Sequence, residues 1–181
     1  MRHIITDIVR SIEPLDALEH RHQHETLGWI GAGHPLFRVA KPATPPMHLV
    51  SYFLLCDVSA RKVLLVDHID ARLWLPSGGH VEPEEHPRET VRREVAEELG
   101  ITASFLSDDP LFITVTETTG ASAGHIDVSL WYALRGDSAA ELRYDGGEFH
   151  TVRWFGLDEL PLDRTDPHLA RFITKLSALL S

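Results

Sequence analysis

The stretch Gly79–Ile101, GHVEPEEHPRETVRREVAEELGI, constrains this chain more than any other part of the sequence. Pro87 suits the first turn of a helix, and Gly100 suits the position just past a helix end. The sequence therefore predicts a helix over Pro87–Leu99. The preceding turn, Leu75–Gly79, ends in two glycines, and glycine allows the backbone to approach a ligand closely.

Three glutamates share one face of this predicted helix. Glu94, Glu97 and Glu98 are spaced i, i+3 and i+4, and the last two lie in the final turn, where the helix dipole disfavours negative charge. Two carboxylates about 6 Å apart repel by roughly 3 kcal/mol at an effective dielectric of about 20. A solvated acidic face would explain the helix taken alone. The alternative is a bound hard divalent cation such as Mg²⁺ or Mn²⁺, which prefers oxygen ligands.

The surroundings of the helix favour the cation. The stretch resembles the box of the Nudix hydrolases, in which glycines, glutamates, an arginine and two aliphatic residues recur at fixed spacing. Chance produces such a match with a probability of about 10⁻⁹ per start position, so the resemblance is specific. Every box position is matched, by Gly79, Glu85, Arg93, Glu94, Val95, Glu97, Glu98, Gly100 and Ile101.

The resemblance implies a fold and a reaction. The family fold is an α/β/α sandwich around a mixed β-sheet. Family members hydrolyse a pyrophosphate bond in a nucleoside diphosphate linked to another moiety, and they use divalent cations because the phosphate charges otherwise repel the attacking water. We therefore expect a pyrophosphohydrolase that uses Mg²⁺ or Mn²⁺ and acts on a nucleotide-type small molecule.

Two other functions are compatible with this fold. A catalytically inactive nucleotide-binding or regulatory module would keep the fold without hydrolysis, but such proteins usually have damaged boxes, and this box is intact. An isoprenoid diphosphate isomerase would need an active-site cysteine motif. The lone Cys56 lacks that context and is expected to be a core thiol.

The resemblance also implies roles for the box residues. Glu97 and Glu98 are expected to be the chief metal ligands, and Glu94 is expected to be a ligand or the general base. The glutamate that accepts the proton from water stays open, because family members differ. Arg93 is expected to pair with Glu85 and so to fix the loop against the helix.

Residues next to the box are candidates for metal and substrate contacts. The carbonyl of Gly79 is a candidate metal ligand, and Gly78, Gly79 and His80 are candidates for lining the phosphate site. His125 and Asp127 alternate along an expected strand, so they point to the same side of it. This pattern suggests substrate contact, and an ordinary solvated sheet face is the alternative.

A further acidic ligand is expected beyond the box. Many family members supply one shortly before a tryptophan-containing strand, and here Glu148 precedes Thr151–Phe155, which includes Trp154. The two glycines before Glu148 predict a turn that would bring its carboxylate to the box helix. Asp145 is the rival in the same turn, and a plain surface turn would explain both residues.

The remaining sequence predicts one α/β domain after a helical extension. The proline-rich tract Lys41–Pro46 separates residues 1–40, the expected extension, from residues 41–181, the expected Nudix hydrolase domain. Apolar periodicity predicts helices over Ile4–Ile12, from Pro14 to about Trp29, and from about Pro167. Short apolar runs predict strands over Leu49–Cys56, Val63–Val66, Leu73–Leu75, Ile101–Leu106, Leu111–Thr118, Ile126–Leu134 and Thr151–Phe155.

Composition limits the partners of the protein. Seventeen basic and 27 acidic residues give a net charge of −10, which is the wrong sign for binding a nucleic-acid backbone. No apolar run approaches the roughly 18–20 residues of a membrane span, and a single cysteine suits a reducing compartment. We expect a cytoplasmic protein without nucleic-acid or membrane partners. The extension at residues 1–40 is a candidate partner surface, including that of a homodimer.

The sequence leaves the nucleotide substrate open. Subfamilies that act on ADP-ribose or on dinucleoside polyphosphates carry a proline or tyrosine marker shortly beyond the box. Positions 116–119 hold Thr, Glu, Thr and Thr, so these markers are absent. Ordinary or damaged nucleoside triphosphates and nucleotide sugars therefore stay among the candidate substrates.

Overall fold

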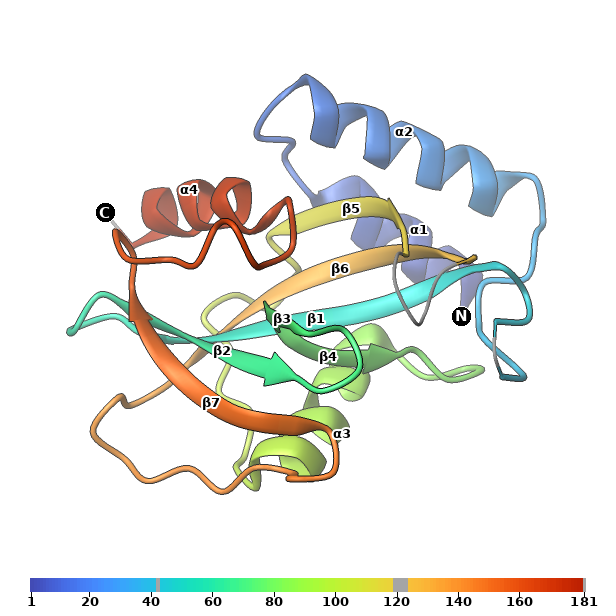
Figure 1. The fold of residues 1–181 in the computed structure, drawn as a ribbon. Helices are drawn as coiled ribbons and strands as arrows, with labels where there is room; N and C mark the ends of the chain where they lie inside the picture. The colour runs from blue at the N-terminus through green and yellow to red at the C-terminus, as the bar shows by residue number, and fades with distance from the viewer. Residues whose placement is uncertain (42, 119–123, 181) are drawn as a thin grey trace.

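A mixed β-sheet forms the centre of the molecule (Figure 1). The computed structural model describes residues 1–41, 43–118 and 124–180. Within these ranges the sheet has the order β3-β2-β1-β6-β5, with β4 paired to β1 and β7 paired to β2. Only β1 and β6 run parallel among the paired strands described. The strands are β1 (Met47–Asp57), β2 (Lys62–His68), β3 (Leu73–Leu75), β4 (Ser77–His80), β5 (Phe112–Glu117), β6 (Ile126–Arg135) and β7 (Phe149–Gly156).

Strand β1 changes its antiparallel partner along its length. Its last residues, Cys56 and Asp57, pair with the start of β2, whereas Val50–Phe53 pairs with β4. Beyond this short pairing, β2 pairs with β3 on the same edge, whereas β7 pairs with β2 along its whole length on the other edge. The sheet therefore forks, and β4 lies in the fork, which places its glycines beside the end of β2 and the turn that leads into β7.

Helices cover both faces of this sheet. They are α1 (Arg2–Ser11), α2 (Ala17–Gly31), α3 (Pro87–Leu99) and α4 (Leu169–Leu179), and Figure 1 shows α3 and α4 on opposite sides of the strands. Alternate β1 residues point to the two faces: Phe53 joins the buried cluster of α3, and Leu54 joins that of α4. The expected α/β/α sandwich with a mixed sheet and N-terminal helices is confirmed.

The N-terminal helices pack directly onto this domain. Ile5 and Val9 of α1 belong to the same buried cluster as the apolar face of α3. Helix α2 lies along β5, where the buried Glu19 carboxylate accepts hydrogen bonds from the backbone N–H of Ile113 (3.3 Å) and from Lys175 of α4 (2.8 Å). The division of the chain at residue 40 stays a prediction. Across the described residues, no helix is long and apolar enough to cross a membrane.

Three expectations about local structure are wrong. The stretch Leu75–Gly79, expected to be a turn, holds the end of β3 and most of β4, because Ser77–His80 pairs with β1. Residues 101–106 form no strand, because β5 occupies most of that edge of β6 and leaves only an isolated bridge between Phe105 and Leu134. Helix α2 begins at Ala17 rather than in the turn of Pro14. The reason is local, because the Asp16 side chain accepts hydrogen bonds from the backbone N–H groups of the first turn and caps the helix there.

Asp16 also joins two helices that are distant in the sequence. Its carboxylate accepts hydrogen bonds from Leu18 and Glu19, both at 2.9 Å, and from the Arg171 guanidinium of α4 at 2.6 and 2.9 Å. The Arg171 hydrogen bonds, followed by the capping bonds, hold the pKa of Asp16 well below its ordinary value. The charged form of Asp16 therefore stabilises the fold.

Asp16→Ala is expected to lower the free energy of unfolding by about 1–2 kcal/mol at neutral pH, because it removes a helix cap. The native pKa is depressed, so the contribution of Asp16 is present above about pH 4 and is lost as the pH falls further. Urea unfolding at pH 7 and pH 3 measures both effects. Asp7→Ala, at an exposed site on α1, is the control, and equal losses in the two variants would contradict the role of the cap.

Candidate functional site

A cavity of about 490 Å³ lies where β4, α3 and the turn before β7 meet. The box helix contributes Glu94 and Glu98 to its wall, and Glu148 faces them from the turn. Three cationic side chains from different parts of the chain also line it, Arg38, Lys41 and Arg93, together with the imidazoles of His68 and His80. The cavity therefore combines a group of carboxylates with cations that suit a phosphate chain.

Arg93 holds the loop before α3 against the helix. Its guanidinium donates to both carboxylate oxygens of Glu85, at 3.1 Å each, and to the backbone carbonyl of His80 at 3.3 Å. The Arg93 guanidinium also donates a hydrogen bond of 2.5 Å to the Glu94 carboxylate. Burial of Glu85 raises the pKa of its carboxyl, but hydrogen bonds from Arg93, from the Glu82 backbone and from Thr90 outweigh this effect and lower the pKa. Glu85 therefore stays ionised, as the pairing requires.

The two inward glutamates of α3 are crowded by like charge. Burial, followed by the repulsion from Glu94 and Glu148, raises the pKa of Glu98 to about 8, although a hydrogen bond donated by the Ser77 hydroxyl opposes this rise. Burial is also the main cause that raises the pKa of Glu94, with further contributions from Glu97 and Glu148. Negative charge is therefore costly here until a cation compensates it.

The backbone of β4 lies unusually close to this group. A Cβ atom at Gly79 would collide with the Glu94 carboxylate, so no larger residue fits while Glu94 keeps its place. This contact brings the β4 backbone within reach of the box carboxylates. The neighbouring donor atoms are carboxylate and carbonyl oxygens, which are the ligands that a hard divalent cation prefers.

The structure separates the expected acidic residues into two groups. Glu94, Glu98 and Glu148 line the cavity, whereas the Glu97 side chain is 65% exposed and lies 3.8 Å from the Arg93 guanidinium at the edge. Asp145 does not line it, because its carboxylate accepts a hydrogen bond from the backbone N–H of Gly147 (2.7 Å) within its own turn.

A second cavity, of about 560 Å³, continues from the first. The two share Arg38, His68, Gly78, Gly79 and His80, so they form one cleft across the fork of the sheet. The apolar and polar residues of the second part include Tyr52, Leu75, Thr116, Glu117, Thr118, His125, Asp127 and Asp166. Among the positions considered as subfamily markers, residue 119 lies outside the described residues.

His80, His125 and Asp127, which were expected near the substrate, all lie in the wall of this cleft. Burial, with a smaller contribution from Arg38, lowers the pKa of His80 to about 4, so its imidazole is neutral at pH 7. Sequence reasoning missed Arg38, Lys41 and His48. Only the last carries a local signal, because it is a polar residue in an apolar strand.

Comparison with known proteins agrees with this geometry. The family model of the NUDIX domain matches residues 46–176. The mouse (Mus musculus) bis(5′-nucleosyl)-tetraphosphatase (asymmetrical) is 35% identical over 110 residues, which cover 57% of this chain and 69% of that enzyme. The rat (Rattus norvegicus) protein of the same name is 36% identical over 92 residues, covering 48% of this chain and 57% of the rat enzyme.

Solved structures share the fold. The Ap4A hydrolase of C. elegans superposes with a TM-score of 0.59 at 19% identity, covering 74% of this chain and 98% of that one. A NUDIX family hydrolase from Clostridium perfringens gives a TM-score of 0.57 at 22% identity, with the same two coverages.

This chain belongs to the NUDIX domain family. Its box is complete, and Glu94 and Glu98 of the box meet basic residues in one cleft. The protein is therefore a metal-dependent pyrophosphohydrolase that acts on nucleotide derivatives.

Arg93→Lys is expected to lower kcat by about 10- to 100-fold although the charge is kept, because lysine cannot make the two-pronged contact with Glu85. Steady-state kinetics with saturating metal measure the loss. Arg92→Lys is the matched control, because Arg92 is the adjacent residue and contacts Glu89 and the Phe105 ring outside the cavity. Equal rates in Arg93→Lys and the unmodified protein would show that the contact is dispensable.

Proposed function

We propose that this enzyme hydrolyses a polyphosphate chain that joins two nucleosides, as in the substrates named for its mouse and rat relatives, although positions 116–119 lack the marker residues of that subfamily. The observation that carries this proposal is the two-part cleft. A carboxylate-lined cavity continues into a second cavity of similar volume, through shared residues. One part has the charges for phosphates and metal, and the other has room and apolar surface for a nucleoside.

Mg²⁺ or Mn²⁺ is the proposed ion. Glu94, Glu98 and Glu148 would hold it together with the Gly79 carbonyl, because these oxygens share one cavity and their mutual repulsion calls for positive charge. When bound, the ion neutralises phosphate charge and makes water more acidic. Glu97 stays a proposed ligand, and its exposed side chain would have to turn towards the cavity.

The chain itself binds and orients the substrate. Arg38 and Lys41 are positioned to attract the phosphate chain at the mouth of the carboxylate cavity. Gly78 and Gly79 let the phosphates approach the β4 backbone, and His80, His125 and Asp127 form part of the wall beside the second group. Glu94 and Glu98 are the candidates for accepting the proton of the attacking water.

The remaining expectations about partners follow from charge and sequence. With a net charge of −10, a nucleic-acid partner is not expected, and neither is a membrane partner. We propose a cytoplasmic enzyme, with residues 1–40 as the surface on which a homodimer would form.

A substrate panel tests the proposed activity. With Mg²⁺ and Mn²⁺ in separate assays, kcat/KM is expected to be at least about tenfold higher for dinucleoside tetraphosphates than for nucleoside triphosphates, ADP-ribose or nucleotide sugars. Chromatography of the products identifies the bond that is cut. A clear preference for any of the other three classes would contradict the proposal.

Substitution of Arg38 tests whether the cleft binds the phosphate chain of the substrate. Arg38→Gln is expected to raise KM more than it lowers kcat, because the side chain lines both cavities and would bind phosphate before and during the reaction. Arg10→Gln on the exposed side of α1 is the matched control. A change in kcat alone would remove Arg38 from substrate binding.

The acidic residues of the cavity are expected to differ in their effects. Glu98→Gln should lower kcat by two or more orders of magnitude, because it removes a buried ligand. Glu148→Gln should chiefly raise the Mg²⁺ concentration for half-maximal rate, because Glu148 lies on a separate turn, and Asp145→Asn should do little. Metal titrations of the three variants measure this. An unchanged metal requirement in Glu148→Gln would exclude this residue from the site.

A further inference from the structure

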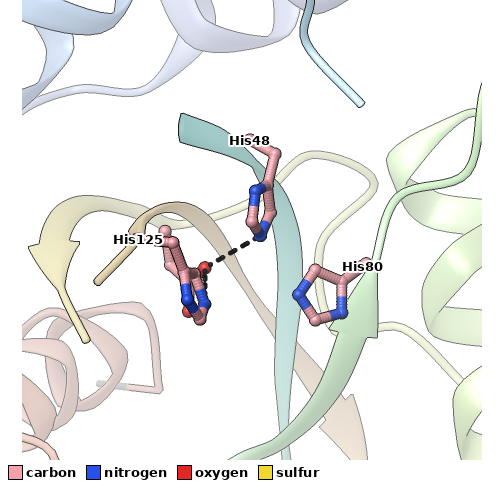
Figure 2. A group of neighbouring side chains, drawn as sticks. His48, His80 and His125 are labelled. Atoms are coloured by element: carbon pink, nitrogen blue, oxygen red, sulfur yellow. Dashed lines mark ion pairs between the residues drawn. The ribbon is translucent and has the colours of Figure 1, made fainter. Parts of the chain in front are cut away.

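Three histidines and one aspartate gather on the wall of the second cavity. His48 lies near the start of β1, His80 ends β4, and His125 and Asp127 lie just before and within β6. Their candidate ligand atoms all lie within 4.8 Å of one another. Figure 2 shows the three imidazole rings, which come from three separate segments, turned towards a common space. Strand pairing places them there, because β1 pairs Asp127 with His48 and pairs His80 with Val50.

Hydrogen bonds on the outer sides of two rings fix which nitrogen faces inward. Nδ1 of His48 donates to the backbone carbonyl of Pro45 (2.9 Å), so its Nε2 carries a lone pair when the ring is neutral. Nδ1 of His125 lies 3.1 Å from the Thr118 hydroxyl, which itself donates to the carbonyl of His125. This leaves Nε2 of His125 as the inward lone pair too. Metal-binding histidines typically have such outer partners.

The inward atoms are all acceptors. Nε2 of His48 and Nε2 of His125 each lie 3.3 Å from the same carboxylate oxygen, Oδ1 of Asp127. The side chain of His48 is fully buried, and those of His125 and Asp127 are 10% and 14% exposed. Nε2 of His48 and Oδ1 of Asp127 are buried without a hydrogen-bond partner in the parts of the chain that the structure describes. Such an arrangement needs positive charge at its centre.

The spacing of these atoms suits a small transition-metal ion. Zn²⁺ binds histidine nitrogens and carboxylate oxygens at about 2.1 Å with tetrahedral geometry, which separates neighbouring ligands by about 3.4 Å. The two 3.3 Å separations around Asp127 agree with this value. The candidate ligand atom of His80 lies within 4.8 Å of the other three, so His80 would have to move closer to complete the set.

This cluster and the box carboxylates lie on opposite faces of β4. The Cβ direction of Gly79 points at the Glu94 carboxylate, and successive strand residues point to opposite faces. The side chain of His80 therefore points away from Glu94, on the same face of the sheet as His48 and Asp127. The donor sets differ as well, because three imidazoles select transition metals whereas carboxylates and carbonyls select Mg²⁺ or Mn²⁺.

We propose that His48, His80, His125 and Asp127 form a binding site for one Zn²⁺-class ion, separate from the catalytic metal site of the Nudix box. The ion links β1, β4 and β6 at the wall of the substrate cleft. The competing arrangement is a protonated histidine paired with Asp127, which needs no metal. The proposal does not rest on the proposed substrate, because metal binding is measured without a nucleotide.

Metal titration of the full chain tests the proposal. The protein is stripped with a chelator, supplied with excess Mg²⁺ to fill the oxygen-rich site, and titrated with Zn²⁺ in a calorimeter and with Co²⁺ in a spectrophotometer. One Zn²⁺ is expected to bind per chain, and Co²⁺ is expected to give the intense visible absorption of tetrahedral coordination with nitrogen ligands. Absence of Zn²⁺ binding under these conditions overturns the proposal.

Variants locate the ion. His125→Gln and Asp127→Asn are each expected to weaken Zn²⁺ binding at least about tenfold, whereas Glu98→Gln and the exposed-site control His24→Gln should leave it unchanged. Loss of Zn²⁺ binding in Glu98→Gln with retention in His125→Gln would place the ion at the box and overturn the proposal. Circular dichroism without metal checks that each variant folds. If the two ligand variants do not fold, the Co²⁺ spectrum of the unmodified chain decides, because weak octahedral absorption overturns the proposal.

Discussion

The contact of one guanidinium with two carboxylates determines the position of the other groups in the cleft. Arg93 holds Glu85 from the loop and Glu94 from its own helix, and it also bonds the backbone of β4 at His80. These bonds bring the loop, the helix and the strand together at the point where Gly79 lies against Glu94. A planar group with several fixed donors can connect three such segments, whereas a point charge cannot.

The fork in the sheet explains why two cavities meet. Because β2 leaves β1 after a short pairing, β4 takes its place, and the backbone of β4 is accessible from both faces. The carboxylates of α3 approach it from one face, and His48 of β1 and His125, which directly precedes β6, lie on the other. The N-terminal segment adds Arg38 at the junction, so residues outside the family match at 46–176 contribute to the cleft.

Helix α3 could be predicted from the sequence because nearby residues set both of its ends. Helix α3 begins at Pro87 and ends at Leu99, as expected, because a proline starts it and Gly100 adopts the left-handed conformation (φ 65°) that ends it. Strand β4 was not expected, because its Ser-Gly-Gly-His sequence has no apolar pattern and forms a strand only by pairing with β1. The roles of the box residues came from a resemblance, and they stay predictions.

Residues that reach the cleft through tertiary contacts could not be predicted from the sequence. Arg38 reaches the cleft only because the N-terminal helices pack on the sheet, and nothing in its own neighbourhood indicates this. His48 is 77 residues from His125 in the sequence, and the parallel pairing of β1 with β6 brings the two together. The exposure of Glu97 likewise depends on the contacts of the whole helix rather than on its place in the box.

We propose that the inward carboxylates of α3, the carbonyl of Gly79 and Glu148 together hold the catalytic divalent ion. A crystal structure of the full chain with Mn²⁺, with anomalous scattering recorded at the manganese edge, measures this directly. We expect an anomalous peak within bonding distance of Glu94 or Glu98 and of the Gly79 carbonyl. A peak confined to the histidine cluster, or to the exposed side of the helix beside Glu97, would contradict it.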